Sequence, residues 1–160
     1  MAVVQPLAAY AYSVGAGINV PQAMTDGSGT TRWANNNDGT PGWAALDFGG
    51  IISITQVTLV WEAAYASAYL IQVSDDGSNW TTIVTATSQT GGTDDWTGLS
   101  ATGRFVRVYA TALGIDPFMS LYTFDVQGTR VSDWSLARSG AVASDEDVIN
   151  VATNVKDNNF

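Results

Sequence analysis

The stretch Thr25-Asp26-Gly27-Ser28-Gly29-Thr30-Thr31-Arg32-Trp33 is the segment around which the rest of the chain is organised. It combines a carboxylate, several hydroxyls, two glycines, one arginine and one tryptophan. Oxygen donors on a loop that glycines bend can converge on a hard cation. The large indole of Trp33 can anchor such a loop in a hydrophobic core. We therefore expect an oxygen-rich loop that is held against a set of strands.

The composition narrows the possible partners. The 160 residues carry a formal net charge of −9, and the six basic residues are scattered singly, which opposes binding to nucleic acid, anionic membranes and other polyanions. The absence of Cys and His excludes disulfides, thiolate and Ser-His nucleophiles, and zinc-imidazole sites. No apolar stretch is long enough to span a membrane. Neutral or cationic partners remain open.

Short runs of alternating apolar and polar residues indicate β-strands. They are separated by turn-forming segments such as 35–42 and 75–79. A slip in the alternation near Thr55-Gln56 predicts a bend or bulge. The runs lie at residues 43–48, 52–61, 69–73, 104–109 and 121–126, with a further strand within 7–14 and a loop predicted over 110–119. The pattern predicts an all-β, antiparallel sandwich or barrel.

Residues 132–160 echo the beginning of the chain. Ile18-Asn19-Val20 recurs as Ile149-Asn150-Val151, and the Asp26 segment is echoed around Asp157. We predict a first domain over residues 1–131, followed over 132–160 by a linker and the truncated start of a second tandem copy. Such a fragment cannot bury a core of its own, so we expect it to be disordered or docked. Chance similarity of polar segments is the alternative.

Several segments over about residues 5–129 together resemble the discoidin domain, also called the coagulation factor 5/8 type C domain, whose bacterial relatives are the family 32 carbohydrate-binding modules. The segments that carry the resemblance are Ala23 to Trp33, Trp43-Ala44-Ala45-Leu46-Asp47-Phe48-Gly49, Val60-Trp61-Glu62, Tyr69 to Trp80, Gly103 to Tyr109 and Ser120 to Val126. The resemblance implies an eight-stranded jelly-roll sandwich, like galactose-binding domains, that binds glycans without catalysis. Tandem copies are common in that family.

The resemblance also implies a structural calcium ion in the Asp26 loop. The ligands carried over by position are the carbonyls of Ala23 and Ser28, the Asp26 carboxylate, Thr31, the Tyr122 carbonyl and the Thr123 side chain. Position 123 is usually Glu in the family, so Thr123 removes a charged ligand and should weaken the site. The alternative is a metal-free turn in which Asp26 caps local amides.

A glycan site is expected on loops at one end of the sandwich. Planar polar groups bind sugar hydroxyls, and aromatic faces pack against the sugar ring. The candidates are Glu62, Arg32, Asn36, Asp38, Tyr65 and Phe118, with Glu62 the foremost because it is a lone carboxylate where a strand meets a loop. As alternatives, Arg32 pairs with a carboxylate such as Asp47, and Tyr65 and Phe118 belong to the core. Trp33, Trp43 and Trp80 are expected to be core residues.

Two pairs of adjacent acids, Asp75-Asp76 and Asp94-Asp95, raise the question of glycoside hydrolysis. That reaction needs two carboxyl groups facing each other across a cleft, which sequential acids in turn-like segments do not provide. We interpret both pairs as solvated turns.

The sequence therefore predicts a secreted, non-catalytic carbohydrate-binding module, although no signal peptide is visible in it. Its role would be to hold a parent glycoside hydrolase or polysaccharide lyase on its polysaccharide. The acidic balance and Glu62 favour a neutral β-glucan or chitosan. The alternative is an adhesion module that binds a protein or a cell-surface glycan.

Overall fold

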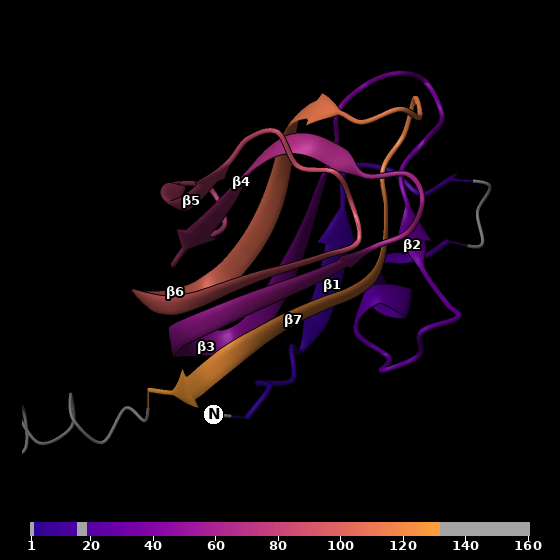
Figure 1. The fold of residues 1–160 in the computed structure, drawn as a ribbon. Helices are drawn as coiled ribbons and strands as arrows, with labels where there is room; N and C mark the ends of the chain where they lie inside the picture. Colours follow the sequence, from indigo (N-terminus) through magenta and orange to yellow (C-terminus); the bar gives the residue numbers. More distant parts are fainter. Residues whose placement is uncertain (1, 16–18, 132–160) are drawn as a thin grey trace, which may run out of the picture. The chain divides into compact units, whose positions relative to one another are not determined.

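Two long antiparallel strands, β3 (Trp43–Trp61) and β6 (Thr93–Leu113), form the centre of the fold (Figure 1). The structure is a computed structural model, and it describes residues 2–15 and 19–131. The other strands are β1 (Ala8–Ala11), β2 (Trp33–Ala34), β4 (Ala66–Ser74), β5 (Thr81–Ala86) and β7 (Ser120–Arg130), and one 3-10 turn, η2, covers Pro21–Met24. All strand pairs are antiparallel, which confirms the predicted fold class. The described residues form seven strands instead of the eight expected.

Both long strands bend and contribute to two layers. The first part of β3 pairs with β1, and the part from Ile52 onward pairs with β7. The bend falls between Asp47 and Ile52, where Gly49 has a φ of +72° that favours glycine. Similarly, only the part of β6 from Phe105 to Leu113 pairs with β4. One layer therefore has the order β1-β3-β6-β4-β5, and the other has β2-β7-β3-β6.

The sequence pattern located the irregularities of β3 better than the limits of β6. The slip predicted near Thr55-Gln56 is confirmed as a register shift between Ile54 and Gln56. The loop predicted over residues 110–119 is wrong in its first part, because β6 continues to Leu113. The turn predicted at Asp94-Asp95 is also wrong, since both residues pair with β3 at Leu59 and Thr58. Backbone hydrogen bonds to a neighbouring strand can hold a polar segment in a sheet, although the segment lacks the alternation that would predict a strand.

The core lies between the two layers. Its largest fully buried side chains include Trp33, Tyr69, Phe48 and Phe124. Trp33 is thus a core residue as predicted, and its indole Nε1 donates a hydrogen bond of 2.9 Å to the Ser13 carbonyl. Trp43 and Trp80 are only half-buried, so their assignment to the core was wrong. Trp80 instead packs against the guanidinium of Arg107, which lies 4.0 Å from the ring centroid.

The predicted linker and second copy at 132–160 lie outside the described residues. Within the described ranges, no helix has the length and apolar character needed to cross a bilayer.

Candidate functional site

Asn35 fixes the loop end of the sandwich. Its side-chain Oδ1 accepts a hydrogen bond of 2.7 Å from the Met119 amide, and its Nδ2 donates one of 3.0 Å to the Thr40 carbonyl. The backbone N–H of Asn35 donates a hydrogen bond of 3.1 Å to the Met119 carbonyl. Because Asn35 is buried, these bonds join the loop over 35–42 to the loop that precedes β7.

Arg32 and Glu62 form an ion pair at this end, with 2.8 Å between Arg32 Nη1 and Glu62 Oε2. Arg32 precedes β2, whose Trp33 is buried, and Glu62 follows the end of β3. Glu62 Oε2 also accepts a hydrogen bond of 3.1 Å from the Ala64 amide. The side chains are 32% and 21% exposed, so the pair is held in place and remains open to solvent. The alternative that Arg32 pairs with a carboxylate is confirmed, but the partner is Glu62 and not Asp47, which binds Arg104. Glu62 is therefore not the lone carboxylate that was predicted.

Arg32 lies where two depressions meet. The smaller, of about 190 Å³, is lined by Gly15, Asn19, Arg32, Ala34, Asn35, Asn36, Asn37 and Phe118. The larger, of about 440 Å³, is lined by Asn19, Val20, Gln22, Ala23, Asp26, Thr30, Thr31 and Arg32. Both are lined by Asn19 and Arg32, which makes them neighbours. The smaller depression combines a cation, amides and one aromatic ring, which is a set of groups that suits a sugar.

Two of the predicted sugar contacts lie elsewhere or are already engaged. Asp38 Oδ1 accepts a hydrogen bond of 2.9 Å from the Thr40 amide and so stabilises its own turn. The Tyr65 ring packs closely against Gly91 and Gly114. A Cβ added at these glycines would lie only 2.9 Å and 2.7 Å from the ring, respectively. Neither residue is among those that line the two depressions. The smaller depression brings together Arg32, Asn36 and Phe118. Glu62 lines neither depression and is joined to them through its ion pair with Arg32.

The Asp26 loop is closed by its own hydrogen bonds. Asp26 Oδ1 accepts from the Ser28 amide at 2.8 Å, and Oδ2 accepts from the Thr31 hydroxyl at 2.6 Å. The Thr31 hydroxyl and then the Ser28 amide lower the pKa of Asp26. This is the arrangement expected of a turn in which an aspartate caps local amides.

The fit of this loop to calcium rests on a single charge. Asp26 and Thr31 place two side-chain oxygen donors together, but position 123 supplies a hydroxyl instead of a carboxylate. Among residues 2–15 and 19–131, no three acidic side chains gather into a metal-binding group. Calcium binds most tightly where several carboxylates surround it. A calcium ion in this loop would be held by the side chains of Asp26 and Thr31, and so small a donor set would bind it weakly.

Sequence and structure comparisons place this geometry in a known family. The family described as F5/8 type C domain matches residues 8–122, which is most of the described chain. The chain belongs to the F5/8 type C domain family. Comparison with curated protein sequences gave no match.

Solved structures of this family resemble the chain over the same region. Chitosan-binding module 1 of a chitosanase/glucanase from Paenibacillus sp. IK-5 is 40% identical, with a TM-score of 0.73 over 78% of this chain and 96% of that one. Module 2 of the same enzyme, solved with chitotriose, is 37% identical, with a TM-score of 0.74 over 78% and 98%. A family 32 module from Clostridium perfringens, solved with GalNAc-β-1,3-galactose, is 20% identical, with a TM-score of 0.70 over 78% and 99%, and shows the shared fold.

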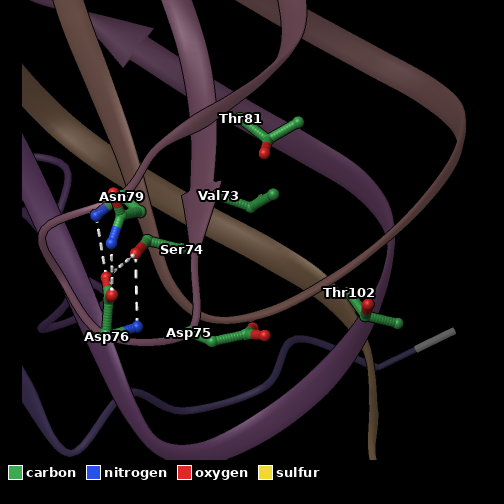
Figure 2. Close-up of a pocket in the computed structure, with 7 residues that line it drawn as sticks. All are labelled: Val73, Ser74, Asp75, Asp76, Asn79, Thr81 and Thr102. Carbon is green, nitrogen blue, oxygen red and sulfur yellow. Dashed lines mark hydrogen bonds between the residues drawn. The ribbon is translucent and has the colours of Figure 1, made fainter.

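In this F5/8 type C domain, three of the four paired acids, Asp76, Asp94 and Asp95, have structural roles. Asp76 organises its turn, and its Oδ1 accepts a hydrogen bond of 2.8 Å from the Ser78 amide. The Asn79 backbone amide also donates to Oδ1 at 2.8 Å, and Asn79 Nδ2 donates to Oδ2 at 2.7 Å (Figure 2). These bonds, with the Asn79 amide first, hold the pKa of Asp76 far below its usual value. Figure 2 shows Asp75 pointing away from Asp76, so the two carboxyls do not face each other.

The other acid pair lies on β6. Asp94 Oδ2 accepts hydrogen bonds from Trp61 Nε1 at 2.8 Å and from the Tyr69 hydroxyl at 2.7 Å. Asp95 Oδ1 accepts from the Thr58 hydroxyl at 2.8 Å. Burial of the Tyr69 hydroxyl, together with its bond to Asp94, raises the pKa of Tyr69 far above its usual value. Adjacent residues of one strand point to opposite faces, so this pair cannot act jointly on a glycosidic bond.

Sequence reasoning missed Asn35 as a positioning residue and Asn19 and Asn37 as lining residues. The run Asn35-Asn36-Asn37 was a visible signal, because it places three side-chain amides with hydrogen-bonding capacity in one loop. Which of them would be buried depends on the Met119 backbone, 84 residues away, and no local pattern contains that information.

Proposed function

We propose that this domain is a non-catalytic carbohydrate-binding module that binds chitosan through the Arg32–Glu62 pair and the depressions beside it. The observation that carries this proposal is the Glu62 carboxylate, which is fixed by Arg32 and the Ala64 amide and still partly exposed. A fixed carboxylate can bind the ammonium group of a glucosamine unit by a charge-assisted hydrogen bond. Two relatives that are 37% and 40% identical are chitosan-binding modules, which supports the same ligand class.

The neighbouring groups suit the rest of a sugar ring. Asn36 is exposed, and its backbone N–H donates a hydrogen bond of 3.0 Å to the Ser13 hydroxyl. This bond fixes the backbone from which the Asn36 side chain extends. Phe118 is half-buried and offers an apolar surface to the C–H groups of a pyranose. A short sugar buries little area, so we expect micromolar to millimolar affinity, about −8 to −4 kcal/mol.

In its parent protein, such a module would raise the local concentration of a glycan-active catalytic domain at an extracellular polysaccharide. A second discoidin-like copy after residue 131 would add avidity without new contacts. We extend the proposal to a weak structural calcium ion in the Asp26 loop, in the millimolar range of extracellular modules. A rise in melting temperature on adding CaCl₂, reversed by EDTA and absent in Asp26→Asn, is the expected result for that ion.

The deciding experiment is calorimetric titration of the full chain with fully deacetylated chitotriose. We expect Glu62→Gln to weaken binding about tenfold or more, while its unfolding curve stays close to that of the wild type. Asp75→Asn is the matched control, because it removes the same charge from an exposed turn and should leave binding unchanged.

Equal weakening in both variants would mean that only net charge matters, and the site would be wrong. Absence of chitotriose binding in the wild type, with retention of the chain by a cell-surface protein, would favour the adhesion reading. Release of reducing sugar from chitosan would contradict the assignment as a non-catalytic module.

A further inference from the structure

A second surface of the domain exposes aromatic side chains. It is the outer face of the layer β1-β3-β6-β4, and we call the set Tyr10, Tyr12, Trp43, Arg107 and Tyr109 the aromatic face. Alternate residues of these strands, such as Ala9, Ala44 and Val108, belong to the core. The aromatic face therefore points away from the core. Tyr10 and Tyr12 are each 50% exposed and Tyr109 is 40% exposed, which is much for large rings on a sheet.

The strand register aligns three of these rings in one row. The Tyr12 amide donates to the Trp43 carbonyl at 2.9 Å, and Trp43 pairs with Tyr109 across β3 and β6. The three side chains thus come from neighbouring strands, about 5 Å apart. In the adjacent row, Tyr10 pairs with Ala45 and Ala45 with Arg107. A row of exposed aromatic side chains at strand spacing can pack along a chain of sugar rings.

Arg107 adds a fixed hydrogen-bond donor beside this row. Its guanidinium carbon lies 4.0 Å from the Trp80 ring centroid and 4.9 Å from that of Tyr109. Its Nε donates a hydrogen bond of 2.8 Å to Gln72 Oε1, and Gln72 Nε2 donates one of 2.9 Å to the Thr82 hydroxyl. These contacts hold the planar group in one orientation. Its remaining N–H groups make no hydrogen bond to another residue in the described part of the chain, so they can donate to ligand hydroxyls.

The charges of the molecule select the class of ligand. The net charge of −9 disfavours a polyanion. A polycation is disfavoured on this face, because within the described ranges no carboxylate lies within 4 Å of the Arg107 guanidinium. The other cation nearby, Arg104, is bound to Asp47. A neutral polysaccharide remains, and β-linked glucose presents flat C–H faces and equatorial hydroxyls that match rings and guanidinium.

We propose that the aromatic face is a second glycan-binding site, specific for a neutral β-glucan and separate from the chitosan site at the loop end. Tyr12, Trp43 and Tyr109 stack against successive pyranose rings, and Arg107 donates hydrogen bonds to their hydroxyls. The two sites divide the ligands by charge, because Glu62 attracts the glucosamine ammonium and Arg107 repels it.

The test is titration of the full chain with soluble barley β-glucan and, separately, with deacetylated chitotriose. The double variant Tyr12→Ala/Tyr109→Ala should weaken β-glucan binding by about tenfold or more and leave chitotriose binding unchanged. Glu62→Gln should do the opposite. Tyr12→Phe/Tyr109→Phe keeps the rings and should retain β-glucan binding. Ile115→Ala is the control for loss of an exposed apolar side chain, since Ile115 is 83% exposed and outside the aromatic face.

Several results would overturn the proposal. One is loss of both ligands in Glu62→Gln, which would mean a single site at the loop end. Another is wild-type binding to polygalacturonate instead of β-glucan, which would give the face to an acidic polymer. Self-association in sedimentation equilibrium that the double Ala variant abolishes would make the face a contact between two copies. Failure of chitotriose binding alone would overturn the function proposed for the loop end and leave this site standing.

Discussion

Two arginine–carboxylate pairs in this domain use the same chemistry in different surroundings. Arg104 binds Asp47 through two parallel hydrogen bonds of 2.9 Å, and the Asp47 side chain is only 7% exposed. Arg32 binds Glu62 through one contact of 2.8 Å, and both side chains remain accessible. Asp47 also accepts a hydrogen bond of 2.8 Å from the Gly49 amide, at the bend of β3.

The difference separates a structural pair from the pair that we propose binds the ligand. The oxygens of Asp47 accept hydrogen bonds from protein donors, so they have little capacity left to bind a ligand. Glu62 is oriented by the protein but keeps hydrogen-bonding capacity toward solvent, because a carboxylate can accept several bonds and Oε1 has no partner in the described part of the chain.

The largest effect is expected from Asp47→Asn. The substitution removes the charge from a nearly buried carboxylate that holds Arg104 and the bend of β3. We expect the free energy of unfolding to fall by about 2–3 kcal/mol, measured by urea denaturation followed by tryptophan fluorescence. Glu62→Gln is the comparison, with an expected change of about 0.5 kcal/mol or less. Equal losses in the two variants would erase the distinction.

The contribution of Asp47 should also depend on pH. Hydrogen bonds from Arg104, then the Gly49 amide, lower the pKa of Asp47 below its usual 3.8. A lowered pKa means that the unfolded chain binds a proton more readily, so this stabilisation is complete above pH 3.8 and is lost as the pH falls through the folded pKa. The difference between wild type and Asp47→Asn should therefore shrink below about pH 3.8. A constant difference from pH 7 to pH 2.5 would show that packing, and not charge, accounts for the loss.

The two pairs also separate features that local sequence patterns predict from features that depend on the fold. The alternation of β3, its slip near Gln56 and the anchoring role of Trp33 follow from local patterns, because a strand with one buried face must alternate. The partners of Arg32 and Asp47 could not be predicted, since Arg104 is 57 residues from Asp47 and the pairing depends on strand register. The sequence assigned Glu62 and Arg32 to the same loop end but did not predict their ion pair. Asp38 and Tyr65 are held by contacts that only the fold creates.

The next effect is expected on ligand affinity from Arg32→Gln. This change removes a donor that lines both depressions and frees the Glu62 side chain to adopt other rotamers. We expect binding of chitotriose to weaken about fivefold to tenfold, with Arg32→Lys between this variant and the wild type, since Lys keeps the charge but not the planar geometry. Arg104→Gln is the control and should alter the unfolding curve without altering affinity. Tighter binding in Arg32→Gln would show instead that Arg32 competes with the ligand for Glu62.

The smallest effect is expected from salt. Raising NaCl from about 0.01 to about 1 M shortens the Debye length from about 30 Å to about 3 Å and screens exposed charges. The affinity of the wild type for chitotriose should therefore fall a few-fold, while Glu62→Gln, which has lost the main attraction for the ammonium group, should show a flatter dependence. The stability difference between wild type and Asp47→Asn should hardly change, because the nearly buried carboxylate is shielded from ions. Identical salt slopes for wild type and Glu62→Gln would place the attraction for the ligand in the overall charge of −9 and not in this carboxylate.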